Sequence, residues 1–164
     1  MKTKDITLAG LMIALSIIVL YLTTIIPINT FAILTVASAI IPVTIMRSNI
    51  KTAVLVYAGT SLIGFFILPI NYFLMYIMFF GVYCIVKYFI EKLRKLPLEI
   101  GLKYVFFNII FVLALTVLKG FIGDIQLNVP YWAFILIAEA AFYIYDYALT
   151  VLISLYIDKF KNIK

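Results

Sequence analysis

Long apolar runs follow one another along almost the whole chain, separated by short polar or proline-containing segments. Each run is close to the roughly 20 residues that an α-helix needs to cross a bilayer. Helices satisfy their own backbone hydrogen bonds, so such runs predict membrane-spanning helices. We predict an all-α membrane protein in which residues 1–164 form a single integral membrane domain. Its six spans are expected at about 6–26, 30–46, 50–68, 71–90, 99–122 and 131–157.

Prolines mark several boundaries between these predicted spans. Pro27 and Pro69 end the first and third spans, and Pro97 occupies a favourable helix-start position. The second span is short and contains Pro42, but a re-entrant segment there would break the alternation of basic loops, so we keep it as a span. The first run is too long for the apolar core of a signal peptide, and we expect an uncleaved helix.

Positive charge is unevenly distributed over the segments between the spans. Of the 13 Lys and Arg residues, all but Lys119 fall on one side of the predicted membrane. Both termini and the segments 47–51 and 91–95 are basic, whereas segments 27–29 and 69–71 carry no charge. Cytoplasmic loops carry the excess of Lys and Arg in membrane proteins. We therefore predict that the N and C termini are both cytoplasmic.

Composition excludes several classes of function. The chain is 66% hydrophobic and 12% charged, against roughly 25% charged residues in soluble domains. The net charge of +6 sits at helix ends, where it fits membrane topology and anionic lipid headgroups better than nucleic acid. The chain has no histidine, and Cys84 is its only cysteine, which removes Ser-His catalysis, an intrachain disulfide and the common zinc sites. We expect no metal, no cofactor and no nucleic-acid partner, in a multi-pass protein of the bacterial plasma membrane.

The first span contains two small residues four positions apart, Gly10 and Ala14. They share a helix face, and small residues in lipid let two helix backbones approach closely. This pair fits two interpretations. The commoner one is a contact within the protein's own helix bundle, and the other is a docking face for a separate membrane subunit.

The last span holds two carboxylates, Glu139 and Asp146, seven residues apart on one face. A carboxylate at mid-bilayer costs about 2.5–3.5 kcal/mol on insertion scales, so both should face protein or water. Asp146 lies about 22 Å below Tyr131, at the level of Lys87 and Lys103. This depth favours a structural ion pair, with a coupling element as the alternative. A protonated Asp146 carboxyl hydrogen-bonded to Asn108 is a further possibility.

Glu139 lies about 12 Å below the outer surface and has no obvious partner at its own level. It is either a neutral carboxyl in a helix contact or a carboxylate that awaits a cationic or hydrogen-bonding ligand. Trp132 is expected mainly as an interfacial anchor. The other candidate ligand contacts around Glu139 are aromatic or polar residues of the outer half: Tyr143, Tyr76, Tyr72, Trp132, Asn71 and Lys119.

The segment Leu8-Ala9-Gly10-Leu11-Met12-Ile13-Ala14-Leu15-Ser16 resembles the first helix of one transporter family. These are the substrate-binding S components of energy-coupling factor (ECF) vitamin transporters, which also have six spans in fewer than 200 residues. The resemblance implies an outward-facing pocket built by helices 4–6 and three outer loops. It also implies docking of the Gly10/Ala14 face to a transmembrane coupling protein, with two ATPase subunits supplying energy. Gly10 stands where the family often has Ala.

We therefore expect a substrate-binding membrane subunit that captures a small aromatic or heterocyclic nutrient from the outer face. Glu139 would anchor a polar or positive group of the ligand, and Lys119 would attract an anionic group near the mouth. The alternatives are a membrane scaffold of the MreD type and a stand-alone small-solute transporter. Neither a D-x-x-D-G run nor an H-E-x-x-H motif occurs in the chain, and we do not expect an enzyme.

Overall fold

The computed structural model describes residues 2–122 and 130–161 of the chain. In these residues every regular element is a helix, and six helical stretches are long and apolar enough to cross a membrane. This confirms the predicted all-α fold with six spans. The elements are α1 (Thr3–Ile25), η1 (Pro27–Asn29), α2 (Thr30–Arg47), α3 (Ile50–Ile67), α4 (Ile70–Met75), η2 (Tyr76–Phe80), α5 (Gly81–Glu91), α6 (Leu96–Ile122) and α7 (Tyr131–Lys161).

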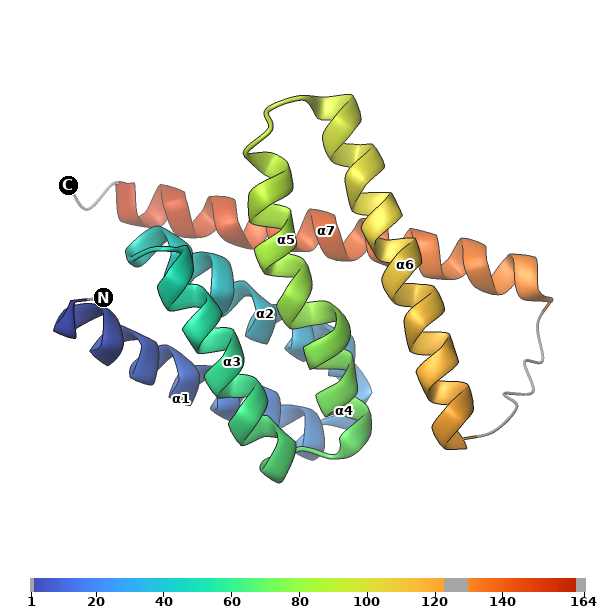
Figure 1. Cartoon of the computed structure of the whole chain (residues 1–164), viewed down its shortest axis with the longest axis horizontal. Helices are drawn as coiled ribbons and strands as arrows, with labels where there is room; N and C mark the ends of the chain where they lie inside the picture. The colour runs from blue at the N-terminus through green and yellow to red at the C-terminus, as the bar shows by residue number, and fades with distance from the viewer. Residues whose placement is uncertain (1, 123–129, 162–164) are drawn as a thin grey trace.

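More helices pack on one side of α5 than on the other (Figure 1). Helix α1 packs against α2 and α3, and α2 also contacts α5 and α7. Helix α6 lies on the other side of α5, and its axis crosses that of α7 in the view of Figure 1. The start of α1 and the end of α7 both lie on the left in Figure 1. That this side is cytoplasmic stays a prediction.

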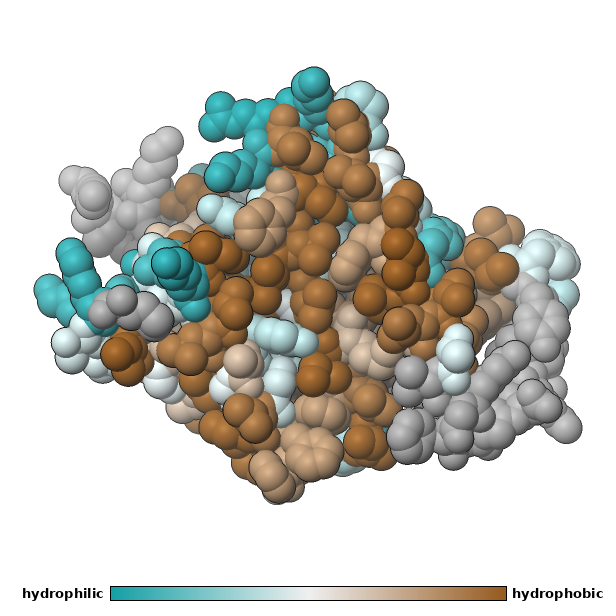
Figure 2. Space-filling model, in the orientation of Figure 1, coloured by the Kyte–Doolittle hydropathy of each residue, from teal (hydrophilic) through white to brown (hydrophobic). Residues whose placement is uncertain are grey.

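The surface has the polarity of a membrane protein. Apolar side chains cover most of the face shown in Figure 2, and hydrophilic residues gather at the loop between α5 and α6 and at the ends of α1 and α3. Large apolar residues such as Phe66 and Leu62 are exposed on α3. An exposed apolar surface of this extent is stable in lipid and not in water. The protein is a multi-pass membrane protein.

The fourth span is a continuous helix with a π-helical turn, η2, between α4 and α5. The Gly81 N–H bonds to the Tyr76 carbonyl five residues earlier. The Tyr57 hydroxyl of α3 donates to the Ile77 carbonyl at 2.8 Å, which supplies this carbonyl of the turn with a partner. A Cβ at position 81 would lie 2.6 Å from Tyr57 Cε2. Glycine is therefore required where the Tyr57 ring packs against the turn.

An aromatic core joins the fourth span to α6 and α7. The rings of Phe107 and Phe142 stack with their centroids 4.5 Å apart, and Phe79 packs edge-on against both of them. Tyr83 and Tyr145 extend the cluster toward α2. Aromatic pairs of this kind add to the stability gained from burial alone. Many of the aromatic residues of the chain therefore serve packing.

Candidate functional site

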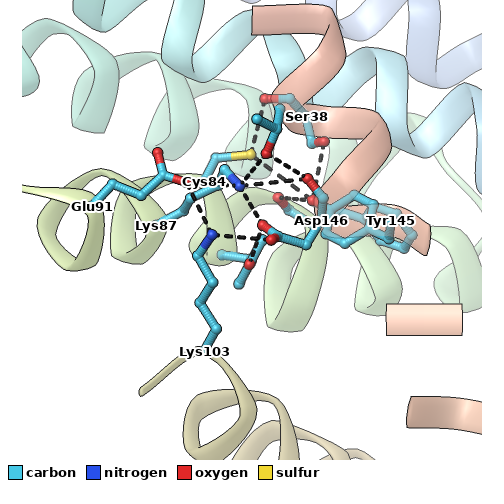
Figure 3. Close-up of polar contacts among 10 residues, drawn as sticks. Ser38, Cys84, Lys87, Glu91, Lys103, Tyr145 and Asp146 are labelled. Carbon is cyan, nitrogen blue, oxygen red and sulfur yellow. Dashed lines mark hydrogen bonds and ion pairs between the residues drawn. The ribbon is translucent and has the colours of Figure 1, made fainter. Parts of the chain in front are cut away.

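Helix α7 contributes one carboxylate to each of two separate groups of polar side chains. The first, which we call the inner ion network, consists of Lys87, Glu91, Lys103 and Asp146 (Figure 3). The Lys103 Nζ lies 3.0 Å from Asp146 Oδ2 and 3.0 Å from Glu91 Oε1. The Lys87 Nζ lies 2.9 Å from Glu91 Oε1 and pairs directly with Asp146 Oδ1. Two lysines thus balance two carboxylates.

Hydrogen bonds complete this network. The Tyr83 hydroxyl donates to Asp146 Oδ1 at 2.6 Å, and the Lys87 ammonium donates to Thr150 Oγ1 at 2.8 Å. The Lys87 side chain is only 2% exposed, so its charge depends on these partners. The ion pair predicted for Asp146 is confirmed, with both Lys87 and Lys103 as partners. The prediction missed Glu91, although its position four residues after Lys87 is the spacing of an intrahelical ion pair.

Buried polar contacts next to the network tie α2, α5 and α7 together. The Cys84 thiol donates to the Ser38 carbonyl at 3.2 Å, and the hydroxyls of Ser38 and Tyr145 are 3.2 Å apart (Figure 3). A cavity of about 120 Å³ beside Cys84 and Lys87 is otherwise lined mainly by apolar residues. Ligand sites for small molecules usually have about 300–1,000 Å³. This region is therefore a structural centre of the bundle.

The second polar group on α7 is the pair of Glu139 and Asn108. Asn108 Nδ2 of α6 donates to Glu139 Oε1 at 2.8 Å and to the Tyr104 carbonyl at 2.9 Å. The other carboxylate oxygen of Glu139, Oε2, is buried and has no hydrogen-bond partner among the described residues. Two expectations from the sequence were wrong here. Glu139 does have a partner at its own level, and Asn108 pairs with Glu139 and not with Asp146.

An open depression of about 760 Å³ adjoins this pair on the flank of α6. It is a shallow surface region and not an enclosed pocket. The described residues that line it are Asn108, Ile109, Val112, Leu113 and Thr116. Asn108 therefore connects the Glu139 carboxylate to a concave, mostly apolar surface. The chemistry that this arrangement offers is hydrogen bonding and charge attraction at one end of an apolar wall.

The other predicted ligand contacts are not gathered around Glu139. Tyr76 is buried on the side of α3, where its ring lies 6.3 Å from that of Tyr57. Tyr143 is 64% exposed, on the flank of the α7 stripe that buries Phe142. Trp132 is 67% exposed near the start of α7, as an interfacial anchor would be.

Three further residues complete the predicted set. Asn71 is exposed and Tyr72 half-buried in the first turn of α4. The side chain of Lys119 lies outside the described residues. Among the residues that the structure describes, no three His, Cys, Asp or Glu side chains come close enough together to hold a metal ion.

The small-residue face of α1 points away from the bundle. Helix α1 packs against α2 and α3 through the opposite stripe, which contains Ala9, Met12, Ser16, Leu20 and Thr23. A Cβ added at Gly10 would meet no atom within 4 Å, and Ala14 is exposed. The interpretation of Gly10 and Ala14 as a contact within the bundle was therefore wrong. The face is open to lipid or to a partner.

Comparisons of the chain with protein-family models, curated proteins and solved structures find no match. The fold and the site together define an α-helical multi-pass membrane protein with one neutralised ion network and one carboxylate–amide pair beside an open depression.

Proposed function

We propose that this chain is the substrate-binding membrane subunit of an ECF-type transporter. It would capture a small nutrient from the outer face of the bacterial plasma membrane, and a coupling protein with two ATPase subunits would drive uptake. The observation that carries the proposal is the open Gly10/Ala14 face on α1. Small residues at helical spacing permit close approach of a second helix, and no helix among the described residues packs on the face.

The separation of the two polar groups supports the same proposal. In the inner ion network each charge has an opposite partner. Glu139 has only the Asn108 amide on one oxygen, and its other oxygen has no partner among the described residues. A carboxylate inside a membrane span is costly, and intramembrane carboxylates commonly mark binding or transport sites. Glu139 and Asn108 are thus the best-supported ligand anchors.

The remaining predicted contacts are not gathered around Glu139, and their ligand roles rest on the sequence. Tyr143 and Trp132 are surface aromatics of α7, and they would contact a ligand only after a movement that covers them. Tyr72 and Asn71 lie where α4 begins, next to an outer turn of the predicted topology. Lys119 would attract an anionic group at the mouth.

Complex formation tests this proposal. The chain is co-expressed with the coupling protein and the two ATPase subunits of the same cell, and the complex is purified through a tag on one ATPase. We expect stoichiometric recovery of the wild-type chain. Gly10→Leu should abolish recovery, because the added side chain occupies the open face.

Gly101→Leu is the matched control, because a Cβ at Gly101 of α6 also meets no atom within 4 Å. This variant should assemble normally. Failure of the wild-type chain to assemble would refute the proposal. Equal losses in the two glycine variants would show that the Gly10/Ala14 face has no special role.

A further inference from the structure

The polar side chains that line the α6 depression have already used their hydrogen-bond donors within the protein. The two N–H bonds of the Asn108 amide point to the Tyr104 carbonyl and to Glu139 Oε1, at 2.9 and 2.8 Å. The Thr116 hydroxyl donates to the Val112 carbonyl at 2.8 Å. What Asn108 and Thr116 can still offer to a ligand is acceptor capacity, on Asn108 Oδ1 and Thr116 Oγ1.

The orientation of the Asn108 amide follows from its neighbours. If its oxygen and nitrogen were exchanged, Oδ1 would face both a backbone carbonyl and the Glu139 carboxyl. An amide oxygen cannot donate to either group, so this orientation would lose two hydrogen bonds. The hydrogen-bond network therefore determines which amide atom is Oδ1, and it leaves this oxygen as an acceptor.

Glu139 is the acidic group behind this acceptor, and its ionised form would add negative charge there. It forms no ion pair with any described residue, since Lys87 and Lys103 are bound by Glu91 and Asp146. Asp146 itself is seven residues further along α7, about 10 Å away along the helix axis. The electric field at the Asn108 end of the depression therefore depends on Glu139, whose described hydrogen-bond partner is the neutral amide of Asn108.

The rest of the depression is apolar. Ile109, Val112 and Leu113 present exposed side chains along the same flank of α6. Such a wall stabilises a hydrocarbon or aromatic body by burying its surface. One end of the depression therefore favours hydrogen-bond donors and positive charge, and the remainder favours an apolar group.

We propose that this depression binds a cationic ligand with an N–H donor on an apolar body. An amidinium or a protonated amino-heterocycle has this chemistry. Its N–H group would bond to Asn108 Oδ1, its positive charge would lie near Glu139 on the far side of the Asn108 amide, and its body would lie on Ile109 and Val112. The inference rests on the proposed function, because it assigns the substrate class of that capture site. Anionic ligands are rejected by the same groups.

Two probes of the same ring size test this selectivity. Benzamidine is a cation with N–H donors, and benzoate is an anion with acceptors only. Binding to the purified full-length protein in lipid nanodiscs is measured by isothermal titration. We expect benzamidine to bind at least about tenfold more tightly than benzoate, which is the scale of a hydrogen bond to a charged group.

Variants locate the binding. Glu139→Gln should weaken benzamidine at least about tenfold, whereas Glu99→Gln, the same change near the start of α6, should have no effect. Val112→Trp fills the depression from an exposed position and should also abolish binding. Binding of neither probe, tighter binding of benzoate, or benzamidine binding that survives both Glu139→Gln and Val112→Trp would overturn the inference.

The outcome is separable from that of the proposed function. Benzamidine binding without assembly of the transporter complex would refute the transporter assignment and leave the ligand class intact. Assembly with a preference for benzoate would do the reverse.

Discussion

The inner ion network allows a quantitative prediction for Asp146→Asn. The substitution keeps the size of the side chain and removes its charge. Among the described residues, Lys87 and Lys103 then have Glu91 as their only acidic partner. Lys87 is 2% exposed and cannot turn to water for compensation. The variant should therefore be strongly destabilised.

The magnitude follows from the burial of the pair. Breaking a buried ion pair by removing one partner costs about 3–5 kcal/mol. Asp146 is 21% exposed, so we take the lower end, about 3 kcal/mol. For a chain of this length 1 kcal/mol corresponds to about 2–4 °C in Tm, which gives a decrease of about 6–12 °C.

The single cysteine provides the assay. Cys84 is 1% exposed, so a fluorogenic maleimide reacts only when the helices separate, and the fluorescence rise during heating reports Tm. Glu99→Gln is the control for a carboxylate outside the network and should shift Tm little. The reasoning would be refuted if Asp146→Asn melted within about 1 °C of Glu99→Gln.

A double variant separates charge from packing. Lys87→Met combined with Asp146→Leu removes one charge of each sign and leaves the Lys103–Glu91 pair, 3.0 Å apart, in place. Apolar replacement of both partners of a buried ion pair is often neutral or stabilising. The double variant should melt above Asp146→Asn. A lower Tm would mean that the hydrogen bonds of these side chains outweigh their charges.

Two further predictions concern the fourth span and the topology. Gly81→Ala should lower Tm, because the new Cβ meets the Tyr57 ring at 2.6 Å and overpacking costs about 1–3 kcal/mol. Gly101→Ala is the control and should leave Tm unchanged, because a Cβ at Gly101 meets no atom within 4 Å. Equal decreases in Tm for the two variants would contradict the packing argument. In a cysteine-free background, Asn71→Cys should react with a membrane-impermeant maleimide on intact cells, and Lys95→Cys only after permeabilisation. The opposite labelling pattern would invert the predicted topology.

The spans were predictable because the apolar pattern and the prolines report them directly. The predicted first span at 6–26 corresponds to Thr3–Ile25, and the predicted last span at 131–157 to Tyr131–Lys161. The π turn at Tyr76–Phe80 was not predicted. It depends on a tertiary hydrogen bond from Tyr57, and no periodicity in an all-apolar segment reveals such a bond.

The two carboxylates of α7 show what counting along a helix can assign. Asp146 could be assigned to Lys87 and Lys103 because a buried charge requires a partner of opposite sign near its depth. The count was not carried through for Asn108, which was considered as a possible partner of Asp146. Asn108 lies five residues beyond Lys103, about 7.5 Å along α6, and Glu139 lies about 10 Å beyond Asp146 along α7. Since Lys103 meets Asp146, the same count places Asn108 nearer to Glu139.

The direction of the Gly10/Ala14 face could not be predicted for a different reason. A helix in lipid is apolar on every side, so hydrophobicity does not distinguish the face toward the bundle from the face toward lipid. Only the packing of Ala9, Met12 and Ser16 on α2 and α3 shows which side is free.

The most direct test of substrate capture is untargeted mass spectrometry of small molecules released from the purified protein. Wild type and Glu139→Gln are prepared in parallel from the same cells and denatured, and the released compounds are compared. The account predicts one nitrogen-containing cationic compound that is enriched with the wild-type protein and depleted at least about tenfold with the variant. Equal enrichment of the compound in both preparations would contradict the account. So would an anionic compound that is retained by both wild type and Glu139→Gln.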